Sequence, residues 1–277
     1  MEFLCQLPIG FLHRLLRSIL AHPQTLIRIG GHALSYRAGL TYGADGHVAD
    51  AEDDDDLSSE SLNRPGSVLA WTLLNALSAP KPQPDSRLSA DLKPRFDRLA
   101  AARGRPGLLA RMHLARALAY LDAIDPAWTK EHFWPRLSWD HPEGLALWRS
   151  YAHCAMGSAR LFNALKPATL VAFERNQLSD NEFDDLVSKL LRVGIWHQRG
   201  EAPEYNLTST EIRRALTVGP PSARRNAARN LWGFMANAED EPADKATRWR
   251  EVVGPLFRDI GRWIPVSVAR TPRATWC

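Results

Sequence analysis

The sequence predicts an all-α protein, built from antiparallel helical hairpins that stack as an irregular α-solenoid or helical-repeat array. Apolar residues recur at three- and four-residue spacing in one segment after another, which is the period of an amphipathic helix. No window shows the two-residue alternation or the β-branched runs of a sheet. The expected helices are joined by short loops and lack long heptad runs, so neighbouring hairpins must bury each other's apolar faces.

Residues 1–60 are expected to hold one helix, irregular structure and an acidic loop. Helical spacing of apolar residues predicts the helix from Pro8 to Ala21. The following Gly-rich stretch lacks sustained periodicity, although residues 25–29 and 33–36 suit either a short helical turn or an extended segment. Residues 50–60 read DAEDDDDLSSE, and so many like charges with little to bury predict an exposed loop.

Residues 61–265 are expected to form the helical-repeat domain, and residues 266–277 a tail that suggests a truncated product. Prolines and capping residues separate the helices of this domain. The predicted helices lie between Asn63 and Pro80, at 89–103, at 107–124, twice within 125–149, at 158–175, at 179–198, from Thr208 through Leu216, from Ser222 to about Met235, and at 243–260.

Several helix starts carry recognisable capping signals. Asp125 precedes Pro126, and Asp140 precedes Pro142 and Glu143, so both aspartates are expected to be N-caps. Thr208 and Glu211 have the spacing of a capping box. Ser222 follows two prolines and is expected to cap the next helix.

Four of the ten tryptophans fall between Asp125 and Arg149, at the junction of two predicted helices. Each tryptophan brings a large apolar area and one N–H that needs an acceptor, which suits a contact between helix pairs. We therefore expect a structural aromatic seam, with an aromatic ligand pocket as the alternative. The seam consists of Trp128, Trp134, Trp139 and Trp148.

A basic stretch covers two successive predicted helices and holds a single acid, Asp97. Its cations are expected on one exposed surface that contacts an acidic protein partner, with simple solvation as the plain alternative. Nucleic acid is the other candidate partner, but the only aromatic residue within the stretch, Phe96, is expected to face the core. The candidate interaction surface consists of Lys93, Arg95, Arg98, Arg103, Arg105, Arg111 and Arg116.

No catalytic, cofactor-binding or metal-ligating residues are predicted. The nine histidines are dispersed without an HExxH pair, and GxSxG, Walker A and GxGxxG motifs are all missing from the sequence. The chain is therefore expected to have no enzymatic activity and no cofactor. Cys5, Cys154 and Cys277 show no CxxC spacing, which fits a reducing cytoplasm. The apolar N-terminal stretch is interrupted by charged residues, so no membrane span is expected.

Several segments resemble the helical C-terminal region of large bacterial proteins that carry a sirtuin-like NAD-hydrolysing domain at the N-terminus. These segments are LNRPGSVLAWTLLNAL at 62–77, ARMHLARALAYLDAIDPAWTKEHFWPRLSW at 110–139, EGLALWRSY at 143–151, NALKPATLVAF at 163–173, and the RNLWGFM and WREVVGPLFRDI segments between 229 and 260.

That resemblance implies a role in anti-phage defence, in which the helical region senses a phage component and a sirtuin-like domain depletes NAD. This chain has no sirtuin-like half, so an effector activity would have to come from a separate domain or subunit. The sequence thus predicts a non-enzymatic helical-repeat interaction module, sensory or regulatory, whose partner is a phage component or an effector subunit.

Overall fold

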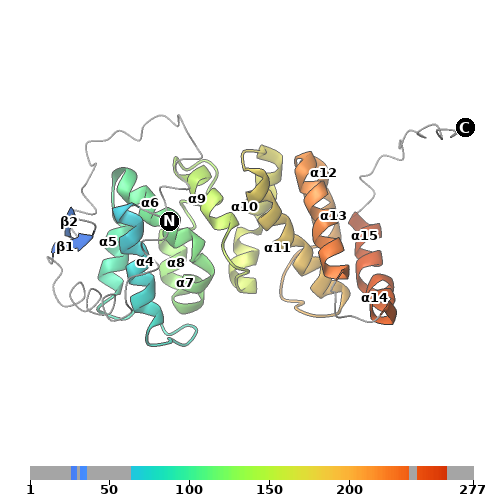
Figure 1. Cartoon of the computed structure of the whole chain (residues 1–277), viewed down its shortest axis with the longest axis horizontal. Coiled ribbons are helices and arrows are strands. Elements are labelled where there is room, and N and C mark those ends of the chain that lie inside the picture. Colours follow the sequence, from blue (N-terminus) through green and yellow to red (C-terminus); the bar gives the residue numbers. More distant parts are fainter. Residues whose placement is uncertain (1–25, 30–31, 36–63, 237–241, 261–277) are drawn as a thin grey trace, which may run out of the picture. The chain divides into compact units, whose positions relative to one another are not determined.

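The computed structural model describes residues 26–29, 32–35, 64–236 and 242–260 (Figure 1). The predicted helix at Pro8 to Ala21, the acidic loop at 50–60 and the tail at 266–277 lie outside these residues. The regular secondary structure of the described residues is helical apart from one antiparallel pair of strands, β1 (Leu26–Ile29) and β2 (His32–Ser35). The prediction of an all-α fold is confirmed at this coarse level.

The chain divides into two compact units, Met1–Leu161 and Phe162–Cys277. The helix α10 (Ala159–Arg175) begins in the first unit and continues into the second. No helix of the described residues is both long enough and apolar enough to cross a membrane. The helices of the first unit are α4 (Pro65–Ser78), α5 (Lys93–Ala101), α6 (Gly104–Arg116), α7 (Leu118–Ile124), α8 (Pro126–His132) and α9 (Gly144–Ala152).

In the first unit, α6 packs against α4 on one side and α9 on the other. A Cβ atom added to Gly66 would lie 2.3 Å from the carbonyl oxygen of Pro106, so α4 and α6 approach too closely for any larger residue there. The hydrogen-bonded pairs Ala119–Cys154 and Asp122–Ser158 ascend together along the chain. α7 therefore runs in the same direction as residues 154–158, which follow α9.

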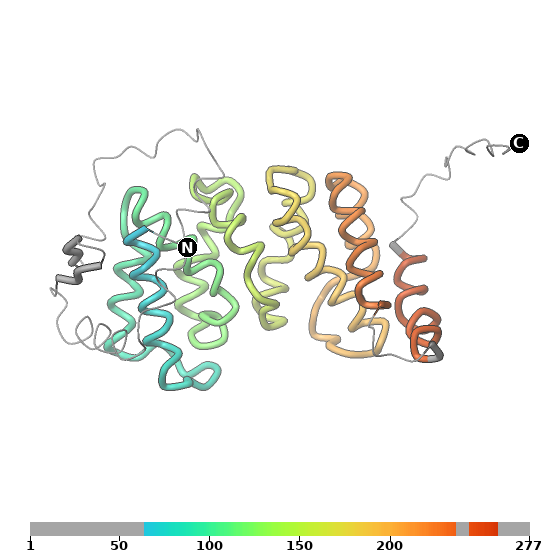
Figure 2. The backbone as a smooth tube through the Cα atoms, in the orientation of Figure 1, coloured from blue at the N-terminus to red at the C-terminus, as the bar shows by residue number. Residues whose placement is uncertain are grey.

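The second unit contains α11 (Asp180–Gln198), α12 (Ser209–Val218), α13 (Pro221–Met235) and a continuous helical segment at its end. That segment comprises α14 (Pro242–Arg248), the π-helical turn η1 (Trp249–Val253) and α15 (Gly254–Ile260). α11 and α13 lie side by side (Figure 2), and α15 packs on α12.

Two of the predicted capping signals are confirmed and two are wrong. Asp125 accepts a hydrogen bond from the Trp128 backbone N–H at 3.0 Å, and Thr208 with Glu211 forms the expected capping box. Asp140 is not an N-cap, because residues 134–143 form turns and the helix begins only at Gly144. Ser222 lies inside α13, which starts one residue earlier at Pro221, and its buried hydroxyl has no hydrogen-bond partner among the described residues.

The helix predicted at 107–124 is interrupted at Ala117, which separates α6 from α7. The physical reason is a competing acceptor, because the backbone N–H of Ala119 donates to the buried Cys154 thiol at 3.2 Å. An uninterrupted helix would direct that N–H to the carbonyl four residues earlier. The bend lets α7 turn toward α8, against which it packs.

Candidate interaction surface

The predicted basic surface lies on α5 and α6, but its members differ in exposure. Lys93, Arg98 and Arg103 are exposed, whereas Arg95, Arg105 and Arg116 are partly buried. All six therefore reach solvent to some degree. A surface of outward-facing cations stays a prediction for these six residues only.

Arg111 corrects the prediction, because only 4% of its side chain is exposed. Its Nε donates to Glu143 Oε2 at 2.8 Å, and its Nη2 donates to the other carboxylate oxygen of the same residue. Its Nη1 donates to the backbone carbonyls of Ala100 and Ala102. Arg111 thus ties α5 and α6 to the start of α9 and is not available to a partner. A charge count along the sequence cannot separate such an internal guanidinium from a solvated one.

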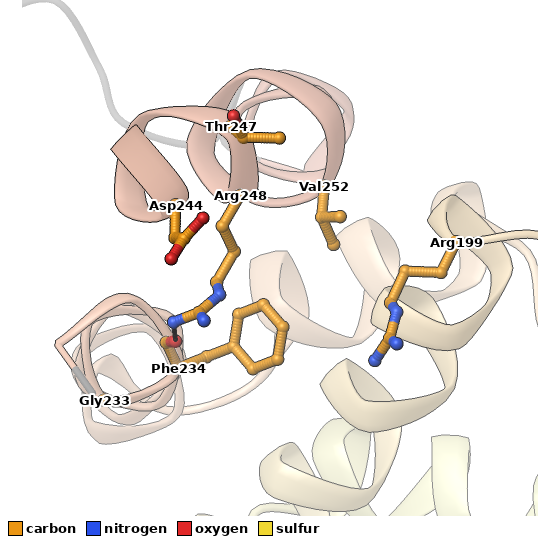
Figure 3. A pocket seen from close by; sticks show the side chains of 7 residues that line it. All are labelled: Arg199, Gly233, Phe234, Asp244, Thr247, Arg248 and Val252. Atoms are coloured by element: carbon orange, nitrogen blue, oxygen red, sulfur yellow. Dashed lines mark hydrogen bonds between the residues drawn. The ribbon is translucent and has the colours of Figure 1, made fainter. Parts of the chain in front are cut away.

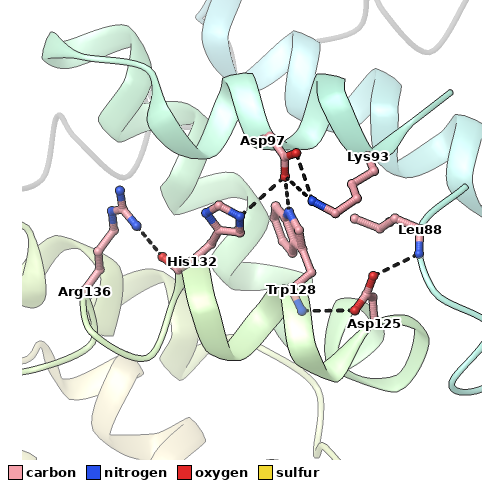
Figure 4. Close-up of polar contacts among 7 residues, drawn as sticks. All are labelled: Leu88, Lys93, Asp97, Asp125, Trp128, His132 and Arg136. Atoms are coloured by element: carbon pink, nitrogen blue, oxygen red, sulfur yellow. Dashed lines mark hydrogen bonds and ion pairs between the residues drawn. The ribbon is translucent and has the colours of Figure 1, made fainter. Parts of the chain in front are cut away.

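Lys93 is exposed but already engaged. Its ammonium lies 3.0 Å from a carboxylate oxygen of Asp97, one helical turn along α5 (Figure 4). This hydrogen bond raises the pKa of the Lys93 ammonium above its usual value. Since both groups are solvated, the pair contributes little to stability and a partner can exchange it.

Arg98, Arg103 and Arg116 are the cations of this surface whose side chains have no hydrogen-bond or ion-pair partner among the described residues. Arg98 lies in the last turn of α5, and Arg103 occupies the N-cap position of α6, five residues later. An unpaired, exposed guanidinium keeps all its donors free for a carboxylate or phosphate. Arg98 and Arg103 are therefore the core of the candidate interaction surface.

Asp97 is the polar centre of the contact between α5 and α8 (Figure 4). One oxygen accepts the indole N–H of Trp128 at 2.7 Å and lies 3.4 Å from His132 Nε2. Burial raises the pKa of the Asp97 carboxyl, but hydrogen bonds from Trp128 and Lys93 outweigh it, and the pKa lies below its usual value. Burial lowers the pKa of the His132 imidazole and outweighs the nearby carboxylates. The cluster therefore holds an ionised aspartate beside a neutral histidine at neutral pH.

The predicted aromatic seam separates into two groups. Trp128 is buried and contacts Phe96, His132 and Phe133. Trp148 is fully buried, stacks on Trp139 with ring centres 5.2 Å apart, and donates its indole N–H to the Leu137 carbonyl.

Trp134 belongs to neither group of rings and is only partly buried. The Lys130 ammonium lies 5.4 Å from the centre of its ring, within the range of a cation–π contact. Its indole nitrogen is buried without a hydrogen-bond partner among the described residues. Trp128, Trp139 and Trp148 thus make ring contacts within the fold, and the four tryptophans do not form one continuous cluster. A structural role for all four stays a prediction.

A second basic stretch, in the other unit, is largely neutralised by neighbouring groups. Arg225 and Arg229 on α13 pair with Asp180 and Asp184 on α11, at 3.2 and 2.5 Å. Arg214 pairs with Glu174 at 2.8 Å. Cations that are paired in this way leave little net field to attract a nucleic-acid backbone. This stretch is therefore a weaker candidate for anion binding than Arg98 and Arg103.

The contacts between α11 and α13 have a constant register. Asp180 bonds to Arg225 and Asn226, and Asp184 bonds to Arg229 and Asn230, so partners are always 45 or 46 residues apart. Since both numbers rise together, α11 and α13 are parallel neighbours. A helix must therefore pass back between them, and α12 supplies it.

Beside this helix pair lies an open cavity of about 600 Å³ between α13 and α14 (Figure 3). The Phe234 ring lies between the side chains of Arg199 and Arg248, and Arg248 donates to the Phe234 carbonyl at 3.0 Å. Arg199 pairs with Glu201 at 2.8 Å. Both arginines are therefore engaged within the fold.

The most exposed large apolar side chain among the described residues is Trp232, on α13, with 72% of its surface accessible. The sequence pattern places this residue near a helix end but gives no sign that it faces solvent, since tryptophan at helical spacing is usually core. No group of three or more metal-ligating side chains occurs among the described residues. Comparisons with protein-family models, with curated proteins and with solved structures find no match to this chain.

Proposed function

We propose that the chain is a helical-repeat module that binds a protein partner and has no catalytic activity of its own. The observation that carries the proposal is the parallel pairing of α11 with α13 at a constant offset of 45 or 46 residues. Helical repeats of the HEAT and armadillo type have periods of about 40–47 residues and place equivalent helices side by side in parallel. Such arrays present long surfaces that suit protein recognition.

The partner surface proposed for the first unit is centred on Arg98 and Arg103, whose guanidinium groups have no partner among the described residues. Acidic side chains of a protein offer the bidentate geometry that guanidinium groups favour. The resemblance to the helical region of sirtuin-associated defence proteins supports a sensory or regulatory role in bacterial anti-phage defence. The partner is then a phage component or a separately encoded effector, met in the bacterial cytoplasm.

The test is capture of partners from phage-infected bacteria by the full chain and by a variant with Arg98→Glu and Arg103→Glu. We expect the variant to lose the captured partner, mainly through slower association, while its melting temperature stays unchanged. A variant with Arg192→Glu and Arg250→Glu carries the same change in net charge on exposed residues of the second unit and should still capture it. Equal capture by all three proteins would remove Arg98 and Arg103 from the partner surface.

Nucleic acid is the second candidate partner, and the same unpaired arginines favour it. If they bind phosphates, the variant with Arg98→Glu and Arg103→Glu should bind nucleic acid more weakly. Its salt slope should also be flatter by about one unit for each phosphate that the variant no longer binds. A gel-shift series at several salt concentrations separates this outcome from protein binding, because a protein-only surface retains no nucleic acid in either form.

A further inference from the structure

The exposed face of α13 carries a regular stripe of side chains. Its residues follow one another at spacings of four, three, four and four, which is close to the spacing of a helix–helix seam. All of them are exposed, whereas Ala223, Ala227 and Leu231, on another face of the helix, are buried. The stripe consists of Pro221, Arg225, Ala228, Trp232 and Ala236.

Trp232 is the centre of this stripe and is unusually open to solvent. Its 72% exposure exceeds the 44% of Trp71 and the 49% of Trp249. Its neighbour Gly233 has no atom within 4 Å of the position where a Cβ would lie, so the fold itself does not require glycine there. Gly233, Ala228 and Ala236 all have small side chains, so little side-chain volume stands beside the indole ring. A second helix can therefore approach the α13 backbone closely.

The two arginines beside Trp232 do not repel an approaching copy of the same surface. Arg225 is 70% exposed and pairs with Asp180, and Arg229 is 63% exposed and pairs with Asp184. Their charges are thus balanced by α11, while the flat faces of the guanidinium groups remain open. A guanidinium held by a carboxylate at its edge is well placed to stack on an aromatic ring.

We propose that this face is a homodimer interface, in which α13 of one copy packs antiparallel on α13 of a second copy. A two-fold axis between Ala228 and Arg229 brings Arg225 of each copy opposite Trp232 of the other, and Pro221 opposite Ala236. Each copy then supplies one cation and one ring to two equivalent cation–π contacts. Small Ala228 lies beside the axis, where the helices come closest.

The second copy is favoured over an unrelated partner because the stripe is complementary to itself. It supplies both halves of the contact on one exposed face, because the cation of Arg225 and the ring of Trp232 lie seven residues, about two helical turns, apart. An isologous interface requires one surface to supply both members of each contact. If residue i of one copy contacts residue j of the other, residue j of the first copy contacts residue i of the second. Tryptophan and arginine are also the residues most enriched at the energetic centres of protein interfaces.

Sedimentation equilibrium of the full chain, with a reductant to exclude disulfides, tests the interface. We expect a concentration-dependent dimer, and Trp232→Arg should raise the dissociation constant at least tenfold by placing two guanidinium groups opposite each other. Trp71→Arg makes the same substitution at an exposed tryptophan of α4 and should leave the dissociation constant unchanged.

The decisive variant combines Arg225→Trp with Trp232→Arg, which exchanges the two roles and restores the complementary pairing. We expect this double variant to dimerise more tightly than Trp232→Arg alone. Circular dichroism confirms that each variant is folded. A chain that stays monomeric at every concentration, a dimer unaffected by Trp232→Arg, or a double variant no tighter than Trp232→Arg overturns the proposal.

Discussion

Arg111 and Glu143 are joined by two hydrogen bonds from one guanidinium to one carboxylate, across the contact between α6 and α9. The arginine side chain is 4% exposed and the glutamate 24%, so the pair is largely withdrawn from water. Two further bonds from Arg111 satisfy the backbone carbonyls at the end of α5. The first unit therefore depends on a charge pair whose members must both be present.

Glu143→Gln should destabilise the protein by about 3 kcal/mol, because it leaves the buried Arg111 charge uncompensated. Urea unfolding at neutral pH measures this loss. The matched control is Glu174→Gln, which breaks the exposed pair with Arg214 and should cost less than about 1 kcal/mol. Equal effects of the two substitutions would show that Arg111 is solvated in the folded protein.

The hydrogen bond from Trp128 to Asp97 gives a pH-dependent prediction. Trp128→Phe keeps most of the buried ring but removes the indole N–H that lowers the pKa of the Asp97 carboxyl. Since the aspartate is more than a third exposed, we expect a loss of only about 1 kcal/mol at neutral pH. A carboxyl whose pKa is lowered by folding stabilises the protein above its unfolded pKa of about 3.9, and this contribution disappears as the pH falls through the folded pKa.

Urea unfolding of the parent and of Trp128→Phe at several pH values tests this relationship. The difference between the two proteins should shrink steadily as the pH is lowered below about 4. Trp71→Phe, at a residue of α4 that is 44% exposed, serves as the control and should show no such trend. A difference that is constant with pH would mean that the indole N–H does not act on the Asp97 charge.

Local rules predicted most of the helices, whereas long-range contacts account for the burial of Arg111 and for the break near Ala117. Asp125 caps its helix because the acceptor and the N–H groups are only three residues apart, and sequence spacing records that distance directly. The burial of Arg111 depends on Glu143, 32 residues away, and the break near Ala117 depends on Cys154. Neither of these two contacts can be predicted from the composition of the chain. The exposure of Trp232 is likewise a property of what fails to cover α13, which no local pattern contains.

The two stacked tryptophans should differ sharply in their contribution to stability. Trp148 is completely buried and donates its indole N–H to the Leu137 carbonyl, so Trp148→Ala should cost about 3–5 kcal/mol. Trp139 lies against the same ring but is partly exposed, and Trp139→Ala should cost clearly less. Thermal unfolding of the two variants establishes the order. If Trp139→Ala cost more than Trp148→Ala, Trp148 and not Trp139 would be the solvent-facing ring of the stack.

If the chain is the non-enzymatic module proposed above, the purified protein should not consume NAD. Incubation of the chain with NAD, followed by chromatography of nicotinamide, measures this directly. A chain heated until it is unfolded provides the background rate. Turnover that persists through repeated purification and is lost on unfolding would contradict the non-enzymatic proposal.

Two glycines in helices should respond in opposite ways to alanine. Gly66 lies where α4 meets α6, and the added methyl group would come within 2.3 Å of the Pro106 carbonyl oxygen, a backbone atom that cannot turn aside. Gly66→Ala should therefore force the helices apart and cost about 1–3 kcal/mol. Gly233, in α13, has open space at the same position, so Gly233→Ala should stabilise the helix by up to about 1 kcal/mol. Urea unfolding of both variants at one protein concentration gives the two signs, and stabilisation by Gly66→Ala would show that α4 and α6 are not in close contact.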